Sequence, residues 1–426
     1  MYGSHRYAHV ALIASAALTT LGLAACSGSG SVAKLNPTSV ARSRAAEASA
    51  DFTITPGGQE ASTSHGITVT AVHGKLTNVT VHSSGDSVTG TMSSDSKSWH
   101  SAWTLDTDTS YTVTASGTDD SGHKISTTKT FRTLNPSESF TTMIFEGSGQ
   151  TYGVGMPIML TFSKPITNKA AVERSLELVT SKPVVGAWYW DGDQQLDFRP
   201  RDYWPADTTV TFTGHLDGVE GAPGVYGTHT LSQTFDIGQS VISVSSTTSH
   251  RTLVYIGGKL TYDWPMSSGR PSLPTPNGTY LTVEKHNPVR MIGTHADYYN
   301  ELVNWAVRFT FSGDYYHSAP WSVSEQGNTN VSHGCVNLSP TNAETYYNLA
   351  VPGDPITITS STKAGKWDDG WTEWFLSWSQ YLQGSATHDA VEAGPSGSTF
   401  VSPSSVSADN ASTPLGTSSA SNWVAG

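Results

Sequence analysis

Apolar and polar residues alternate along much of the chain, in short runs separated by turn-forming clusters. Residues 67–72 and 111–115 place an apolar or large side chain at every second position, which is typical of half-buried strands. The clusters at 83–86 and 119–122 are rich in Ser, Gly and Asp, which favour turns. Short alternating strands between regular turns predict an immunoglobulin-like β-sandwich over residues 51–137.

A second unit, residues 138–240, repeats this pattern and adds many aromatic residues. Strands are expected at 158–162 and 210–213. The aromatic residues concentrate between positions 188 and 205, and two interpretations are open. They fill the core of a second sandwich, because buried aromatics dominate small β cores, or they form a platform on which sugars stack. The core interpretation is favoured.

The third unit, residues 241–361, combines strands with one short helix. Its expected strands are 241–244, 252–256 and 355–359. Gly257 and Gly258 lie between two such runs and predict a two-residue hairpin turn. Residues 340–349 predict a helix, for which Thr341 is a plausible N-cap.

The C-terminal part changes character twice. Its aromatic residues are spaced by four, three, one and three positions: Trp367, Trp371, Trp374, Phe375 and Trp378. This spacing predicts a helix within residues 362–383 that packs one aromatic face on the third unit, in preference to binding glycan. Residues 384–426 are mostly Ser, Ala, Thr and Gly, and are predicted to be a disordered tail.

The N-terminus has the pattern of an export signal. Two basic residues, His5 and Arg6, precede the apolar run 11–23, which is shorter than the ~20 residues of a membrane-spanning helix. The sequence Leu-Ala-Ala-Cys that ends this run at Cys26 resembles a bacterial lipobox, in which the cysteine is lipidated. An ordinary cleavage site with an incidental cysteine is the alternative. We therefore expect a signal peptide at 1–25, followed by a lipidated flexible tether at 26–50.

Composition narrows the function. The length of 426 residues suits roughly three domains. The net charge is −12 and Lys and Arg do not cluster, which disfavours a nucleic-acid partner. The chain has two cysteines, Cys26 and Cys335, which could pair in principle. If Cys26 is acylated, Cys335 is the only thiol left, and a lone thiol in an exported protein suggests that it does chemistry.

Polar residues that could take part in catalysis are densest around Cys335. A thiol attacks carbonyls as the thiolate, so it needs a neighbouring base. His317 and His333 are both candidates, and His317 is preferred because neighbouring strands commonly bring a distant histidine to a cysteine. Ser318 could orient the His317 ring through its backbone carbonyl. Gly334 would let backbone N–H groups approach the oxyanion of a tetrahedral intermediate.

The motif Ser-His-Gly-Cys-Val-Asn-Leu at 332–338, with His-Ser-Ala-Pro-Trp at 317–321, resembles the catalytic signature of the L,D-transpeptidase (YkuD-type) family. The lipobox, two immunoglobulin-like domains, a catalytic domain and a Trp-rich C-terminal helix resemble the layout of its actinobacterial form. The resemblance covers about residues 51–383. It implies a mainly β fold in which two sandwiches precede the catalytic domain.

The resemblance also implies roles for individual residues. Cys335 would be the nucleophile and His317 the general base positioned by Ser318, with Gly334 and His333 beside the nucleophile and the role of His333 open. Substrate contacts are implied for Tyr299, Ser312, Gly313, Ser332 and Asn337. Many members of the family have Arg at the position of Asn337, and Asn offers a carboxylate only neutral hydrogen bonds. The actinobacterial branch shares the Asn.

The implied reaction is a two-step acyl transfer. Cys335 would attack the carbonyl before the terminal D-alanine of a tetrapeptide stem, and a side-chain amine of a neighbouring stem would then take the acyl group. Carbapenems would be expected inhibitors. An L,D-carboxypeptidase on the same scaffold and a non-catalytic wall-binding lipoprotein are the alternatives. The enzyme would be anchored through Cys26 outside the membrane and reach into the wall, with the sandwiches as spacers.

A metal site built from His317, His333 and Cys335 is disfavoured. Zinc takes about four ligands, or three and a water molecule, and the sequence has none of the usual ligand spacings. We therefore expect neither a metal nor another cofactor.

Overall fold

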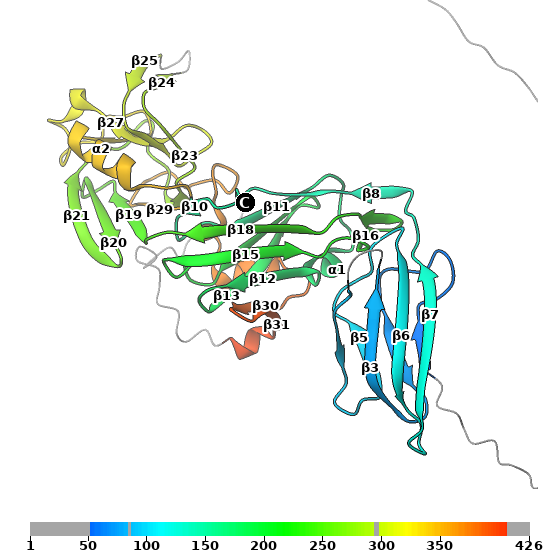
Figure 1. Cartoon of the computed structure of the whole chain (residues 1–426). Coiled ribbons are helices and arrows are strands. Elements are labelled where there is room, and N and C mark those ends of the chain that lie inside the picture. Colours follow the sequence, from blue (N-terminus) through cyan, green and yellow to red (C-terminus); the bar gives the residue numbers. More distant parts are fainter. Residues whose placement is uncertain (1–51, 84–86, 294–297, 407–426) are drawn as a thin grey trace, which may run out of the picture. The chain divides into compact units, whose positions relative to one another are not determined.

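The computed structural model describes residues 52–83, 87–293 and 298–406, and these residues are mainly β, as expected (Figure 1). The expected signal peptide and tether, with Cys26, lie outside the described residues. In the described part of the chain, no helix is both long enough and apolar enough to cross a membrane.

The first sandwich consists of two sheets around one core. Its strands are β1 (Phe52–Thr55), β2 (Thr68–Ala71), β3 (Lys75–His82), β4 (Gly90–Met92), β5 (Ser98–Ser101), β6 (Ser110–Thr118) and β7 (Lys124–Arg132). The sheet orders are β1-β2-β5-β4 and β3-β6-β7. Tyr111, Val113 and Ala115 of β6 are buried in the core while their neighbours are more exposed, as the alternation predicted.

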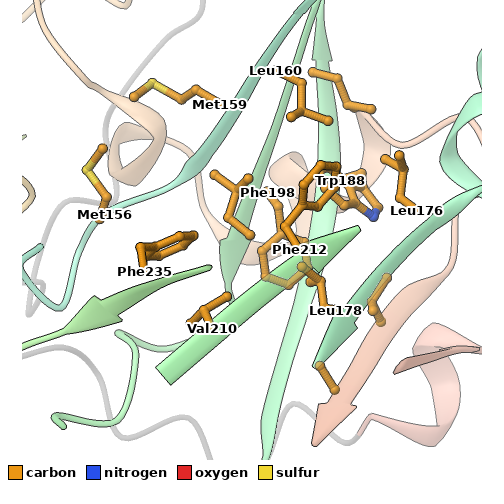
Figure 2. Close-up of a cluster of buried hydrophobic side chains, with 14 of the residues drawn as sticks. Met156, Met159, Leu160, Leu176, Leu178, Trp188, Phe198, Val210, Phe212 and Phe235 are labelled. Atoms are coloured by element: carbon orange, nitrogen blue, oxygen red, sulfur yellow. The ribbon is translucent and has the colours of Figure 1, made fainter. Parts of the chain in front are cut away.

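The second sandwich is built around a larger sheet. Its elements before residue 240 are β8 (Glu138–Phe140), β9 (Thr142–Ile144), β10 (Thr151–Tyr152), β11 (Ile158–Phe162), α1 (Lys169–Glu173), β12 (Leu176–Thr180), β13 (Val184–Asp191), β14 (Gln195–Pro200), β15 (Thr208–Gly214), β16 (Glu220–Ala222), β17 (Val225–Gly227) and β18 (Leu231–Ile237). A cluster of buried side chains that includes Trp188, Phe198 and Phe212 forms its core (Figure 2). The core interpretation of these aromatics is therefore confirmed.

Two strands near the C-terminus complete this sheet, and the prediction of disorder over 384–426 is wrong for them. They are β30 (Ala390–Gly394) and β31 (Gly397–Val401), followed by the 3-10 turn η3 (Pro403–Ser405). Strand β30 lies between β12 and β13 in the sheet order β10-β18-β15-β12-β30-β13-β14-β11-β9, and β31 pairs with β30. The low apolar content hid β30, because its small side chains are buried by partners about 200 residues away.

The third unit has two larger sheets and one two-stranded sheet. Its elements are β19 (Val241–Ser246), β20 (Arg251–Ile256), β21 (Lys259–Pro265), β22 (Gly278–Leu281), β23 (Glu284–His286), β24 (Val289–Ile292), β25 (Asn300–Val303), β26 (Ala306–Arg308), β27 (Tyr315–Ser318), η1 (Pro320–Ser322), β28 (Val336–Leu338), α2 (Pro340–Leu349) and β29 (Pro355–Thr359). The sheet orders are β21-β20-β19-β29-β22 and β23-β26-β27-β28, and β24 and β25 form a separate hairpin.

Helix α2 has the predicted bounds but a different N-cap. Ser339 is the cap, since its side chain accepts a hydrogen bond from the Asn342 N–H, whereas Thr341 lies inside the first turn. Pro340 stands at the first helical position, where its missing N–H costs nothing.

The Trp-rich segment is not one helix. It forms the short turn η2 (Glu373–Phe375) and the helix α3 (Trp378–Gln383), with extended backbone at Leu376 between them. Trp371 and Trp374 are buried in the core of the second sandwich, while Phe375 packs on Tyr280 of the third unit. The segment therefore packs on both units, and not on the third alone as predicted.

A buried arginine holds this segment on the second sandwich. The Arg199 guanidinium lies 4.4 Å from the Trp374 ring centre and 4.5 Å from that of Tyr381, and its Nη2 donates to the Leu376 carbonyl at 2.9 Å. Cation–π contacts of a desolvated arginine are stronger than those at exposed sites.

We predict that deleting residues 390–426 lowers the free energy of unfolding of the second sandwich by about 3–5 kcal/mol. The deletion removes a strand from inside the sheet and exposes the apolar side chains that Val391 and its neighbours bury. Urea unfolding followed by tryptophan fluorescence measures the effect. Deleting only residues 407–426 is the control, because it keeps every described strand; equal midpoints for the two deletions would contradict the prediction.

Candidate active site

The pairing of two short strands brings the expected nucleophile and base to one face. Strand β27 pairs in parallel with β28, with Tyr316 opposite Val336 and His317 opposite Asn337. Side chains alternate across a sheet, so Tyr316 and Val336 enter the core of the third unit while His317 and Asn337 point to the other side. Cys335 precedes Asn337 by two residues, so its side chain lies on the same face as those of Asn337 and His317.

His317 is held in one tautomer. Its Nδ1 lies 3.0 Å from the Ser318 carbonyl oxygen, which can only accept, so Nδ1–H donates and Nε2 is left as the basic nitrogen. The side chain is buried, and burial lowers the pKa of His317 to about 4, although the bond to Ser318 opposes this shift. The imidazole is therefore neutral at neutral pH and can accept a proton.

Cys335 rests as a neutral thiol. Burial raises the pKa of Cys335 above its ordinary value, and the negative charge of Asp314 raises it further. The backbone N–H groups of Tyr315 and Cys335 oppose both effects by favouring the thiolate. The sulfur lies 3.8 Å from the Gly313 carbonyl oxygen. The resting pair is thus thiol and imidazole, and the proton must move during attack.

The turn before the nucleophile is braced from within. The Ser332 hydroxyl donates to the Cys335 carbonyl at 2.6 Å and accepts from the Gly334 N–H at 3.1 Å. The buried Thr275 hydroxyl donates to the Gly334 carbonyl. The hydroxyl of Ser332 is therefore used inside the turn, where a substrate contact was expected.

Gly334 is required by its surroundings. Its φ is +145°, and a Cβ there would lie 2.2 Å from the Asp314 carboxylate oxygen. Any side chain would displace Asp314 and strain the backbone next to the nucleophile.

Asn337 also bonds within the protein. Its Nδ2 donates to the Ser322 hydroxyl at 3.0 Å, and its side chain is buried. This bond ties η1, which follows His317 along the chain, to the strand that follows Cys335. The Nδ2 of Asn337 thus has a structural partner within the protein, and its contact with substrate stays a prediction.

The β24–β25 hairpin reaches the nucleophile through Tyr299. The Tyr299 ring lies with its centre 4.5 Å from that of His333, two residues before Cys335. The side chain of its neighbour Tyr298 is 69% exposed. Met291 and Val303 of the hairpin pack in one cluster with Cys335.

Ser312 and Gly313 lie on the turn before β27, where they contact residues that the sequence analysis did not single out. The Asp369 carboxylate accepts from the N–H and the hydroxyl of Ser312. Burial and the charge of Asp369 raise the pKa of Asp314 to about 6, against the lowering effects of Lys363 and the Thr310 hydroxyl. Asp314 could have been suspected from the sequence, because it lies two residues before Tyr316 and so close to the motif that begins at His317. Thr275 and Asp369 carry no local signal, because they are far from Cys335 in sequence.

Comparisons with known proteins match both parts of the chain to described families. The family model described as L,D-transpeptidase catalytic domain matches residues 239–358, and the one described as bacterial Ig domain matches residues 58–220. L,D-transpeptidase 5 of Mycobacterium tuberculosis is 35% identical over 314 residues, which cover 72% of this chain and 69% of that protein.

Two further relatives come from the same organism. L,D-transpeptidase 2 is 31% identical over 331 residues, covering 75% of this chain and 80% of the relative. L,D-transpeptidase 1 is 37% identical over 218 residues, covering 50% of this chain and 81% of the relative.

We predict that alkylation of Cys335 by iodoacetamide keeps accelerating above pH 9, because the raised pKa keeps the thiolate fraction small up to that pH. Asp314→Asn should accelerate alkylation at pH 7.5 at least about threefold, since it removes a negative charge that disfavours the thiolate. Intact mass against time measures the rate. A rate that levels off below pH 8 would indicate a thiolate–imidazolium pair instead.

Proposed function

Because this chain belongs to the L,D-transpeptidase family, we propose that it cross-links peptidoglycan by acyl transfer through Cys335. The observation that carries the proposal is the β27–β28 pairing, which puts Cys335 and His317 on one face. The neutral state of His317 supports the role of general base, because only an unprotonated imidazole can take the thiol proton.

In the first half-reaction, the Cys335 sulfur attacks the carbonyl before the terminal D-alanine of a donor stem. His317 Nε2 takes the thiol proton as the C–S bond forms. The C–N bond then breaks, the leaving nitrogen takes the proton from His317, and free D-alanine departs from a thioester on Cys335. The Cys335 N–H, which favours the thiolate, is a donor available to the oxyanion.

In the second half-reaction, a side-chain amine of a neighbouring stem attacks the thioester. His317 takes a proton from this amine, the C–S bond breaks, and the sulfur leaves and is reprotonated by the imidazolium. An amide bond between two stems is the product. The L,D-carboxypeptidase alternative differs only in that water takes the place of the amine, so it uses the same residues of this chain.

Fewer observations bear on recognition of the donor stem than on the acyl transfer. Gly313 and Tyr299 are the implied contacts that remain close to Cys335: the Gly313 carbonyl lies 3.8 Å from the sulfur, and the Tyr299 ring contacts that of His333. Ser332 and Asn337 support the substrate indirectly, since their polar groups hold the turn and η1. We infer that His333 orients Tyr299 and takes no part in proton transfer, because His317 has the geometry of the base.

The location follows from the substrate. Peptidoglycan stems lie outside the cytoplasmic membrane, so the enzyme acts there. We further infer that a lipid on Cys26 anchors it to the membrane, and that the sandwiches extend the catalytic unit toward the wall. The apolar run and the Leu-Ala-Ala-Cys sequence support this anchor.

We predict that the purified chain, incubated with a disaccharide carrying a tetrapeptide stem, releases D-alanine and forms a cross-linked dimer. Cys335→Ala should form neither product, and His317→Gln should slow both by about 10²–10⁴-fold, the usual contribution of general base catalysis. Chromatography with mass detection measures both products. D-alanine without dimer would favour the carboxypeptidase, and unchanged products from Cys335→Ala would refute the assigned nucleophile.

We predict that Cys26→Ser releases the full chain from the membrane fraction when it is expressed in a bacterium that processes lipoproteins. Lipidation requires the thiol, which serine lacks. Cys335→Ser is the matched control, because it makes the same substitution at the other cysteine and should leave the chain on the membrane. Equal membrane fractions for both variants would mean that Cys26 carries no anchor.

A further inference from the structure

The segment 367–375 connects the second sandwich to the active-site turn. On the sandwich side, the Trp374 Nε1–H donates to the Gly155 carbonyl at 2.8 Å, and Trp371 and Trp374 are buried in the sandwich core. The Trp367 Nε1–H donates to the Asp191 carboxylate at 3.3 Å. These contacts fix the segment on a rigid sheet.

On the side of the active-site turn, both carboxylate oxygens of Asp369 accept hydrogen bonds from Ser312. The Ser312 N–H donates to one oxygen at 2.6 Å and the hydroxyl donates to the other at 2.7 Å. Hydrogen bonds to an ionised acceptor are roughly twice as strong as neutral ones. The next residue, Gly370, has a φ of +127°, and a Cβ there would lie 2.7 Å from the Phe309 carbonyl oxygen. The segment thus needs glycine to lie directly against the residues before Ser312.

The turn that Asp369 holds carries groups that lie next to Cys335 and next to Gly334. The Thr310 hydroxyl accepts from the Gly313 N–H at 3.2 Å and from the Asp314 N–H at 2.7 Å. The Gly313 carbonyl lies 3.8 Å from the Cys335 sulfur, and the Asp314 carboxylate fills the space beside Gly334. A shift of Ser312 would therefore move the surroundings of the thiol.

We propose that Asp369 is a positioning residue for the acyl transfer, which fixes the 310–314 turn against Cys335 through Ser312. The proposal rests on Cys335 being the nucleophile. It also changes the role of Ser312: both its donors are engaged by Asp369, and the charge of Asp369 would repel a substrate carboxylate at the same place. Ser312 then supports the site from behind, where a donor contact was implied by the family resemblance.

The test is the rate at which a carbapenem acylates Cys335 in the purified chain, followed by intact mass over a range of carbapenem concentrations. Asp369→Ala should lower the maximal rate about tenfold, since a small misplacement at a reacting centre is costly, and leave the half-saturating concentration nearly unchanged. Asp369→Asn should recover part of the rate, because its amide oxygen still accepts from Ser312. Asp368→Ala is the matched control, as Asp368 is the exposed neighbour with the same charge.

A double variant separates the two roles of Ser312. If Ser312 acts through Asp369, the pair Ser312→Ala and Asp369→Ala should be no slower than Asp369→Ala alone. Additive losses, with Ser312→Ala raising the half-saturating concentration, would mean that Ser312 contacts the substrate and would overturn the proposal. Equal rates for Asp369→Ala and Asp368→Ala would overturn it too.

Controls for folding and for the nucleophile complete the design. Thermal midpoints of all variants show whether each is folded at the assay temperature. If Asp369→Ala is not folded there, Asp369→Asn takes its place in the test. An acylation rate of Asp369→Asn equal to that of Asp368→Ala would then count against the proposal. Acylation that persists in Cys335→Ala would refute the proposed nucleophile, whatever Asp369 does.

Discussion

The active site depends on the register between β27 and β28. Because side chains alternate along a strand, this register sends Tyr316 and Val336 into the core and turns His317 and Cys335 to the opposite face together. A slip of one residue would exchange the two sets, placing the thiol in the core and a bulky apolar side chain in the site. The core packing of Tyr316 and Val336 is thus what holds the proposed catalytic pair together.

Burial acts on both members of this pair in the same sense. It disfavours the charged form of each group, so it raises the pKa of Cys335 and lowers that of His317. The pair rests neutral, and Asp314 reinforces this for the thiol. A thiol outside the cell gains from this arrangement, because a neutral thiol is less reactive toward oxidants than a thiolate. In the proposed mechanism, reactivity arises when His317 takes the thiol proton during attack.

The second sandwich is tied to the catalytic unit by the C-terminal part of the chain. Its strand β30 comes from beyond the catalytic unit and lies between β12 and β13, so the catalytic unit is inserted in the chain between β18 and β30. The same C-terminal stretch buries Trp371 and Trp374 in the sandwich core and reaches Ser312 with Asp369. Sandwich and active-site turn are therefore joined by side-chain contacts as well as by the chain itself.

The sequence by itself determined what local patterns encode: the alternating strands of the sandwiches, helix 340–349, and the motif that singled out Cys335 and His317. Only the tertiary structure decided the rest. Strand β30 was predicted to be disordered because its small side chains are buried by residues distant in sequence. The spacing of the Trp residues suggested one helix, although the aromatic residues of this segment pack into the cores of two units. Thr275 and Asp369 gain their roles from contacts with Gly334 and Ser312, and such contacts between distant segments leave no periodic trace in the chain.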